Sequence, residues 1–253
     1  MSAVTRYSAY DRFAWIYNQH WGHTFSKRVL PVLEKLLLRH LPAKALILDL
    51  CCGTGQLAQT LVAREYQVTG LDGSEEMIRF ARGNAPKGEF IVNDARFFKL
   101  PGVYHGVIST FDSLNHIMSL EELTSVFRNV YSALREGGLF LFDLNMEEGF
   151  KSRWRGSFGI VEDDHVCIVR ASYRPKERIG QTDITIFRLE DEWYRSDLTL
   201  LQKCYSEEEI QSALEMVGFT QIHAYDAQRD IEMRGEIGRT FFVCRKPVKA
   251  DGG

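Results

Sequence analysis

The sequence has no apolar run of the roughly 18 residues that a membrane-spanning helix requires. It also lacks a charged segment followed by an apolar one, which is the pattern of a secretory signal. We therefore expect a soluble, cytoplasmic protein without a membrane partner. The net charge is −3 and the pI about 6.2. With no basic stripe in the chain, a nucleic-acid partner is not expected either.

Cysteine is scarce and irregularly spaced. The five cysteines are odd in number, and none of the spacings typical of zinc ligands is present. Most lie in apolar runs, which favours reduced, buried thiols, so neither a metal site nor a disulfide framework is predicted. Internal repeats and low-complexity linkers are also absent. The composition, 45% hydrophobic and 26% charged, is that of an ordinary globular protein.

Residues 45–63 carry the most informative pattern. An apolar run reaches Asp49, a turn with Gly53 and Gly55 follows, and a helical period then begins. This order is typical of a buried parallel strand, a tight turn and a helix. Because glycine lacks a Cβ, the turn can adopt positive φ and a ligand can lie against bare backbone. Asp72 ends the next apolar run, at a spacing that suits a carboxylate binding a ribose diol.

The turn by itself leaves two ligands open. Residues 53–58 fit the G-x-G-x-x-G/A pattern of a dinucleotide site, as in an NAD-dependent oxidoreductase. Asp49, however, would lie close to the pyrophosphate of that cofactor, and like charges repel strongly in a low-dielectric crevice. A cationic ligand is favoured instead. S-adenosylmethionine has a sulfonium, an ammonium and a ribose, and it has no phosphate.

The segment 49–55, Asp-Leu-Cys-Cys-Gly-Thr-Gly, with Asp72 after it, resembles the cofactor motif of the class I S-adenosylmethionine-dependent methyltransferases, small-molecule branch. The family usually has glycine where this chain has Cys51. The resemblance covers residues 1–145 and implies S-adenosylmethionine as cofactor and S-adenosylhomocysteine as product. Neither an Asn-Pro-Pro-Tyr motif nor a Pro-Cys nucleophile motif of base methylation is present. A small-molecule acceptor is therefore expected.

The motif and the resemblance together predict the cofactor-binding residues. They are Tyr10, Tyr17, Asp49, Cys51, Gly53, Gly55, Asp72, Gly73, Met77, Asn93, Asp94, Ala95 and Phe111. Tyr10 and Tyr17 recur at helical spacing and resemble a lid whose tyrosines contact the cofactor, although a helix that only caps the sheet would show the same period. The family often has Asp after the second tyrosine, where this chain has Asn18. Core packing is an alternative for Met77, and turn capping is one for Asp94.

Six predicted strands end in, or just before, an aspartate. These residues are Asp49, Asp72, Asp94, Asp112, Asp143 and Asp226. The carboxyl ends of parallel strands meet at the ligand crevice of an open sheet, so this row suits a cationic, hydroxyl-rich ligand. Helix capping accounts for part of the row. We exclude Asp226 from the site because the last strands of the family reverse direction.

The expected fold is α/β: a Rossmann-like, doubly wound, mostly parallel sheet of seven strands, with an antiparallel β insertion after strand five. Residues 1–150 and 205–246 are predicted to form the cofactor-binding core, with residues 1–23 as an N-terminal lid. Residues 151–204 are predicted to form the insertion, which would bind the acceptor, and residues 247–253 a tail.

Local signals indicate individual elements. Helices are predicted at residues 26–41, with Pro31 at a start or kink, and from a capping box at Ser119 to Gly137-Gly138. Another is predicted from Ser206 to Gly218. Strand five is predicted at residues 139–142. About three insertion strands are predicted, at residues 161–173, 182–189 and 193–202.

The predicted function is transfer of a methyl group to a nitrogen or oxygen of a small molecule by in-line displacement. A hydroxyl acceptor would need a general base, for which His116 and His165 are the candidates. The acceptor platform is expected in the insertion, which is loosely similar to those of amino-sugar methyltransferases. Its candidate lining is Trp154, Tyr173, Trp193 and Tyr194. A non-catalytic cofactor-binding module and an NAD-dependent oxidoreductase remain alternatives, and the protein is expected to be a monomer or homodimer.

Overall fold

The structure, a computed structural model, describes residues 7–249. Its main sheet has seven strands in the order β10-β11-β5-β4-β1-β2-β3. These are β1 (Leu46–Leu50), β2 (Gln67–Asp72), β3 (Glu89–Val92), β4 (Tyr104–Ser109), β5 (Leu134–Asn145), β10 (Thr220–Asp226) and β11 (Arg239–Arg245). Every neighbouring pair is parallel except the two that include β11. The prediction of a doubly wound, mostly parallel seven-stranded sheet is confirmed.

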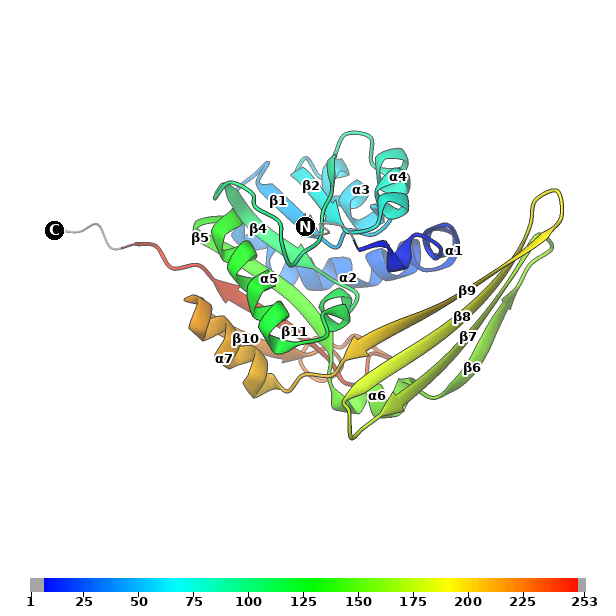
Figure 1. The fold of residues 1–253 in the computed structure, drawn as a ribbon. Helices are drawn as coiled ribbons and strands as arrows, with labels where there is room; N and C mark the ends of the chain where they lie inside the picture. The colour runs from blue at the N-terminus through cyan, green and yellow to red at the C-terminus, as the bar shows by residue number, and fades with distance from the viewer. Residues whose placement is uncertain (1–6, 250–253) are drawn as a thin grey trace, which may run out of the picture.

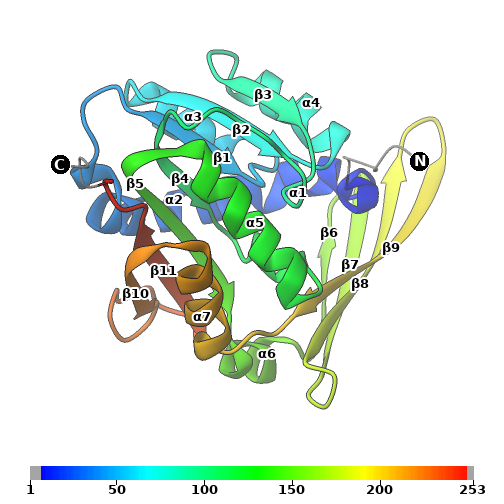
Figure 2. The ribbon, with the colours of Figure 1, turned by 60° about the vertical axis from the view of Figure 1, so that its left-hand side comes forward.

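Helices cover both faces of this sheet, as Figures 1 and 2 show. The helices are α1 (Ala14–His20), α2 (Gly22–Leu36), α3 (Gln56–Ala63), α4 (Glu75–Asn84), α5 (Leu120–Ala133), α6 (Glu147–Arg153) and α7 (Glu207–Val217), with short 3-10 turns η1 (Ser8–Tyr10), η2 (Leu38–His40) and η3 (Ser113–His116). Helices α5 and α7 bury their apolar stripes in one core, and α2 and α3 bury theirs in a second core on the opposite face. Both faces of the central strands are thereby shielded from water, which explains their continuous apolar sequences.

Serine caps fix where three helices begin. The hydroxyls of Ser74, Ser119 and Ser206 accept the amide hydrogens of Met77, Glu122 and Glu209. At α7 the Glu209 side chain also accepts the Ser206 amide, which completes a capping box. Helix α7 ends at Val217, and Gly218 caps it with a φ of 107°, a conformation that favours glycine.

A second sheet of four antiparallel strands follows α6, in the order β6-β7-β8-β9. Its strands are β6 (Gly156–Val161), β7 (His165–Arg174), β8 (Ile179–Leu189) and β9 (Trp193–Lys203). The predicted count of about three strands was short by one, because β6 is a largely exposed edge strand that contains Gly156 and Gly159. Its weak apolar alternation gave little signal.

This second sheet has two distinct faces. The outer face is polar, with Thr185 donating to Asp197 and Thr199 donating to Asp183. The inner face is apolar, and part of it packs on α1 in a core that joins Phe13 and Ile16 to residues of β7, β8 and β9. The N-terminal helix and the insertion therefore form one wall (Figure 1).

Several predicted boundaries were wrong. Helix α2 begins at Gly22 and contains Pro31 in its interior. This is tolerated because Pro31 and Lys27, whose carbonyl loses its partner, are both exposed to water. Helix α5 ends at Ala133, before Gly137, because β5 already begins at Leu134 and pairs there with Tyr104 of β4.

Asp226 was excluded for the wrong reason. Strand β10 is antiparallel to β11, and β11 is antiparallel to β5, so β10 runs in the same direction as β5. Asp226 therefore does end its strand at the carboxyl edge of the sheet. It lies on the outermost strand, where its carboxylate accepts the amides of Gln228 and Arg229, and it is not part of the central cavity described below.

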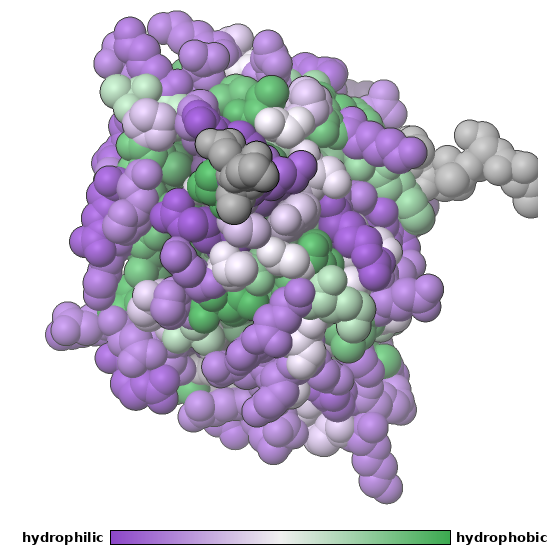
Figure 3. Space-filling model, turned by 90° about the vertical axis from the view of Figure 1, so that its left-hand side faces the viewer, coloured by the Kyte–Doolittle hydropathy of each residue, from purple (hydrophilic) through white to green (hydrophobic). Residues whose placement is uncertain are grey.

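Hydrophilic residues cover most of the face drawn in Figure 3, and the hydrophobic residues visible there lie in patches between them. Within residues 7–249, none of the helices is both long enough and apolar enough to cross a membrane.

Candidate active site

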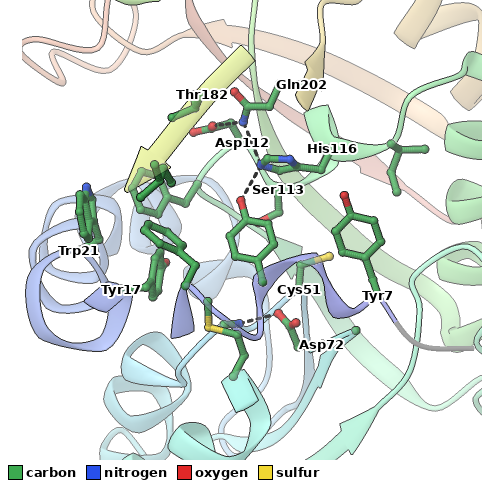
Figure 4. Close-up of a pocket in the computed structure, with 18 of the residues that line it drawn as sticks. Tyr7, Tyr17, Trp21, Cys51, Asp72, Asp112, Ser113, His116, Thr182 and Gln202 are labelled. Atoms are coloured by element: carbon green, nitrogen blue, oxygen red, sulfur yellow. Dashed lines mark hydrogen bonds between the residues drawn. The ribbon is translucent and has the colours of Figure 1, made fainter. Parts of the chain in front are cut away.

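One cavity of about 440 Å³ lies between the carboxyl edge of the main sheet, the N-terminal segment and the inner face of the second sheet. Figure 4 shows that its side chains come from all three parts of the chain. Such a volume is in the range of small-molecule sites. Most predicted site residues line it: Tyr10, Tyr17, Cys51, Gly53, Asp72, Gly73, Met77, Asp94, Ala95, Phe111 and His116.

The loop after β1 adopts the conformation that its glycines permit. Cys51, Gly53 and Gly55 all have positive φ, of 59°, 55° and 80°. Gly53 faces the cavity, whereas Gly55 does not line it and caps α3 instead. A Cβ at Gly55 would lie 2.8 Å from the Cα of Ala81, so this glycine permits α3 to approach α4. The left-handed backbone at Cys51 is the conformation for which the family's usual glycine is suited.

Asp72, at the end of β2, connects two loops of the site. Its carboxylate oxygens accept the backbone amides of Gly53 and Ser74, each at 2.9 Å. Burial raises the pKa of Asp72 to about 6, although these amides oppose the shift. Each oxygen retains a further lone pair, so the carboxylate can accept hydrogen bonds from a ligand.

Asp49 lies beneath the same loop and is 2% exposed. It does not line the cavity, and its Oδ2 has no hydrogen-bond partner among the described side chains and backbone. Burial, with the negative charge of Asp72, raises the pKa of Asp49 to about 8. An unpaired buried carboxylate next to a second one favours a cation nearby and disfavours a phosphate. These carboxylates, as hydrogen-bond acceptors and negative charges, therefore fit the ammonium, sulfonium and ribose of S-adenosylmethionine.

The segment after β3 is held by an ion pair. Arg96 donates to both oxygens of Asp94 and also pairs with Glu122. Asn93 does not line the cavity, because its Oδ1 turns back to accept the amide of Asp94. The carboxylate of Asp94 is thus engaged in local bonds, and both Asp94 and Ala95 line the cavity.

The N-terminal segment covers the cofactor loop. Tyr17 places its ring where a Cβ on Gly53 would lie 3.4 Å from it. Asn18, next to it, accepts hydrogen bonds from Gln56 of α3 and Asn84 of α4, each at 2.8 Å. The family resemblance predicted no contact for Asn18. In the structure its amide oxygen nevertheless links α1 to both helices.

His116 lies where the main sheet meets the second sheet. Its Nδ1 is 2.9 Å from the carbonyl oxygen of Leu201, which only accepts, so Nδ1 carries the proton in the neutral ring. Nε2 therefore accepts, and the Tyr10 hydroxyl donates to it at 2.7 Å. Burial lowers the pKa of His116, although Asp112 opposes the shift. Burial raises the pKa of Tyr10. The pair therefore consists of a neutral imidazole, which can act as a base, and a phenol that donates a hydrogen bond to it.

A buried ion network forms the polar end of the cavity, and sequence reasoning missed it. Arg239, at the start of β11, pairs with Asp112, Asp143 and Glu236. Arg153 of α6 pairs with the same Glu236. The sequence signals were the predicted strand-end aspartates Asp112 and Asp143 and an arginine that opens an otherwise apolar strand, and nothing in the sequence paired them. Its three carboxylate partners are brought to it only by the fold.

The network sets the charges of its acids. Burial alone would raise the pKa of Asp112, but Arg239 and Gln202 hold it below its usual value. Burial raises the pKa of Asp143 to about 6 in spite of the same arginine. Gln202 of β9 donates to Asp112 at 2.6 Å and lies 3.2 Å from His116 Nε2, which connects the network to the histidine.

His165 lies away from the cavity. Its ring contacts the Trp15 ring, its Nε2 bonds to His20 Nε2 at 2.7 Å, and its Nδ1 bonds to Asp164 at 2.6 Å. His165 thereby links α1 to β7, and its position outside the cavity gives no support to a catalytic role.

The second sheet lines the cavity mostly with residues other than those expected. Trp154 does line it, but Tyr173 stacks on Phe150, and Trp193 and Tyr194 are about half exposed near the distal hairpin. The lining side chains of the second sheet are Phe158, Val169, Ala171, Thr182, Ile184 and Gln202. They alternate with outward residues along each strand, but which face is inward depends on the fold. Across residues 7–249, no group of three or more His, Cys, Asp or Glu side chains is arranged to hold a metal ion.

Comparison with known proteins supports the predicted family. A family described as "Methyltransferase domain" matches residues 47–138, which include the loop after β1, Asp72, Asp94 and His116. The putative methyltransferase YqeM of Bacillus subtilis is 28% identical over 244 residues, covering 94% of this chain and 97% of that protein. The crystal structure of an S-adenosylmethionine-dependent methyltransferase from Clostridium acetobutylicum superposes with a TM-score of 0.76 at 21% identity, covering 94% and 99% of the two chains.

Residues 47–138 thus match a methyltransferase family, and the chain is similar over nearly its whole length to a relative named as a methyltransferase. The recognition from residues 49–55 and the predicted cofactor are thereby confirmed. The NAD-dependent oxidoreductase and the non-catalytic module are set aside. A third relative, the dTDP-3-amino-3,4,6-trideoxy-alpha-D-glucopyranose N,N-dimethyltransferase of Streptomyces venezuelae, is 27% identical over 146 residues, covering 57% of this methyltransferase and 61% of that enzyme.

Proposed function

We propose that this methyltransferase transfers the methyl group of S-adenosylmethionine to an oxygen or nitrogen of a small molecule bound against the second sheet. One observation carries the proposal: Gly53 and Asp72 of the cofactor loops share a single cavity with Val169, Thr182 and Ile184 of the insertion. A cofactor on the loops and an acceptor on the sheet would therefore meet in one cavity. Relatives named for methylation of an amino sugar and for ubiquinone biosynthesis act on small molecules as well.

The cofactor half would be held by the residues predicted for it. Asp72 has free lone pairs for a ribose diol, and Gly53 offers backbone without a Cβ. Asp49 supplies a buried carboxyl group below the loop that a bound cation would favour in its ionised form, and Tyr17 and Met77 supply apolar surface. The bound cofactor supplies an already activated methyl group, so the protein contributes placement and exclusion of water more than bond activation.

The Tyr10–His116 pair would receive the acceptor's proton. Tyr10 donates to His116 Nε2, so its own oxygen is free to accept an O–H or N–H from the acceptor. A proton taken by Tyr10 can be passed on as the Tyr10 proton moves to His116. Asp112, close to the ring and linked to it through Gln202, favours the cationic imidazolium that results.

Thermal unfolding with S-adenosylmethionine, S-adenosylhomocysteine and NAD in parallel tests the proposal. A ligand at 100 times its dissociation constant adds about 2.7 kcal/mol to the free energy of unfolding. We expect stabilisation by the first two ligands and none by NAD. Formation of S-adenosylhomocysteine should then depend on a pooled fraction of small metabolites. Stabilisation without any turnover on that fraction would oppose a small-molecule acceptor.

A further inference from the structure

We infer that the acceptor has an uncharged, apolar body, an aryl ring or an alkyl chain, and that it is not attached to a nucleotide diphosphate. The inference rests on the proposed function, since it concerns the acceptor half of the same cavity. It separates this enzyme from the relative that is named for a dTDP-linked sugar.

The wall that faces the acceptor half is apolar. Phe158 of β6, Val169 and Ala171 of β7, and Ile184 of β8 lie on the inner face of the second sheet and line the cavity. Trp154 lines it beside them. Apolar contact gains about 25 cal/mol for each Å² removed from water, which rewards a ring or chain and not a sugar or phosphate.

The positively charged side chains that line the cavity are already paired with carboxylates, so none of them is available to bind a phosphate. Three arginines line it, and each already contacts at least one carboxylate. The pairs are Arg96 with Asp94 and Glu122, Arg153 with Glu236, and Arg239 with Asp112, Asp143 and Glu236. Five carboxylates thus surround these three guanidinium groups and Arg28, which lies outside the cavity and also pairs with Glu236, and Asp72 adds a sixth carboxylate. A diphosphate brought here would meet uncompensated negative charge at low dielectric, which is strongly unfavourable.

The polar end has room for one neutral donor. Nε2 of Gln202 donates to Asp112, and because a carboxylate only accepts, this bond fixes the orientation of the amide. Oε1 of Gln202 is buried and has no hydrogen-bond partner among the described groups, and the residue as a whole is 5% exposed. Figure 4 draws Gln202 and Thr182 at the same end of the cavity as Asp112 and His116. A single O–H or N–H group on the methyl-accepting substrate would donate the hydrogen bond that this Oε1 lacks.

Binding to the S-adenosylhomocysteine complex tests the inference without knowledge of the natural acceptor. Calorimetric titration would use 4-propylphenol as the aryl probe, 1-hexanol as the alkyl probe and thymidine diphosphate as the nucleotide probe. We expect at least one apolar probe to bind at least about tenfold more tightly than thymidine diphosphate, and the stronger of the two identifies ring or chain. Tighter binding of thymidine diphosphate, or binding of neither apolar probe, would overturn the inference while leaving the proposed methyl transfer intact.

Two variants of the edge strand locate the binding. Phe158 lines the cavity and is 53% exposed, whereas Val161 lies on the opposite face of β6 and is 76% exposed. Phe158→Asp should weaken the apolar probe about tenfold or more, because a carboxylate in the apolar wall must be desolvated. Val161→Asp makes the same kind of change on the outer face and should leave the affinity unchanged. Equal affinities in the two variants would refute the assigned wall. Failure of S-adenosylhomocysteine to bind the unaltered protein would instead refute the proposed function.

Discussion

Arg239 Nη2 donates to Asp112 Oδ1 at 2.6 Å, across 127 positions of the chain. The bond joins β11, the reversed strand of the sheet, to the residue that precedes η3, and His116 lies in η3. Arg239 is 2% exposed, and Asp143 and Glu236 share it. The carboxylates hold the pKa of Arg239 above its usual value although burial alone would lower it. The bond therefore helps to fix the position of η3, and with it the candidate base His116, relative to β11.

Arg239→Met should destabilise the fold by about 3–5 kcal/mol, the usual cost of removing one partner from a buried ion pair. The loss arises because Asp112 and Asp143 remain buried without their cation. Urea unfolding measures it. Arg229→Met is the matched control, because Arg229 is paired with Asp230 at the surface and is 77% exposed. That control should change the free energy of unfolding by less than about 1 kcal/mol. Equal effects of the two substitutions would show that the buried network does not stabilise the fold.

Asp72→Ala should weaken binding of S-adenosylmethionine by roughly 1.5–3 kcal/mol, the scale of a hydrogen bond to a charged group. The substitution removes the carboxylate that is proposed to bind the ribose of the cofactor. The same carboxylate accepts the hydrogen bonds of the Gly53 and Ser74 amides. Calorimetry gives the dissociation constant. Asp226→Ala is the control, since Asp226 ends a strand at the same edge of the sheet but lies outside the cavity. An unchanged affinity in a folded Asp72→Ala protein would exclude the assignment.

The sequence predicted what depends on neighbouring residues. The apolar run before Asp49, the glycine turn and the serine caps each have a local physical cause, so their elements were found. The cavity-lining positions of Gly53 and Asp72 followed from the rule that parallel strands meet at one edge. Such rules need no knowledge of distant contacts.

The missed features depend on distant contacts. Arg239 meets Asp112 only because β11 inserts next to β5. Gln202 reaches His116 only because β9 returns to η3. Alternation in the insertion predicted strands, but Trp193 and Tyr194 were expected at the acceptor although they lie about half exposed in β9, while Phe158 in an unpredicted strand lines the cavity. Residue type alone does not show which face of a sheet is covered.

Asp49→Asn should change how stability depends on pH. The pKa of Asp49 is raised to about 8 in the fold from an ordinary value of 3.8, so the folded protein binds the proton more tightly than the unfolded chain. The stabilising contribution is complete below about pH 4 and is lost as the pH rises to about 8. The difference in unfolding free energy between wild type and Asp49→Asn should therefore fall across this window and level off above it. A difference that does not depend on pH would contradict the raised pKa.

The same carboxylate should make cofactor binding depend on pH. A cation bound near Asp49 favours the ionised form, so binding of S-adenosylmethionine should release a proton near neutral pH. Affinity should rise between pH 6 and 8 in wild type and much less in Asp49→Asn. Titrations in buffers of different ionisation enthalpy count the protons released. Identical proton release in both proteins would place the titrating group elsewhere.

His116→Ala and Tyr10→Phe should each lower kcat by about 100-fold, the lower end of what general base catalysis contributes. Burial lowers the pKa of His116 below 6.5, so the ring is neutral at pH 7. The wild-type rate should fall only on the acid side of that pKa, and this acid limb of the pH profile should be absent in His116→Ala.

Two other histidines serve as controls. His223→Ala removes an exposed histidine of β10 and should leave the rate unchanged. His165→Asn tests the other predicted histidine and should not remove the acid limb, because His165 lies outside the cavity. If His116→Ala keeps the full rate and its melting temperature, the pair takes no proton. The acceptor would then be an amine that arrives neutral, for which placement beside the methyl group is sufficient.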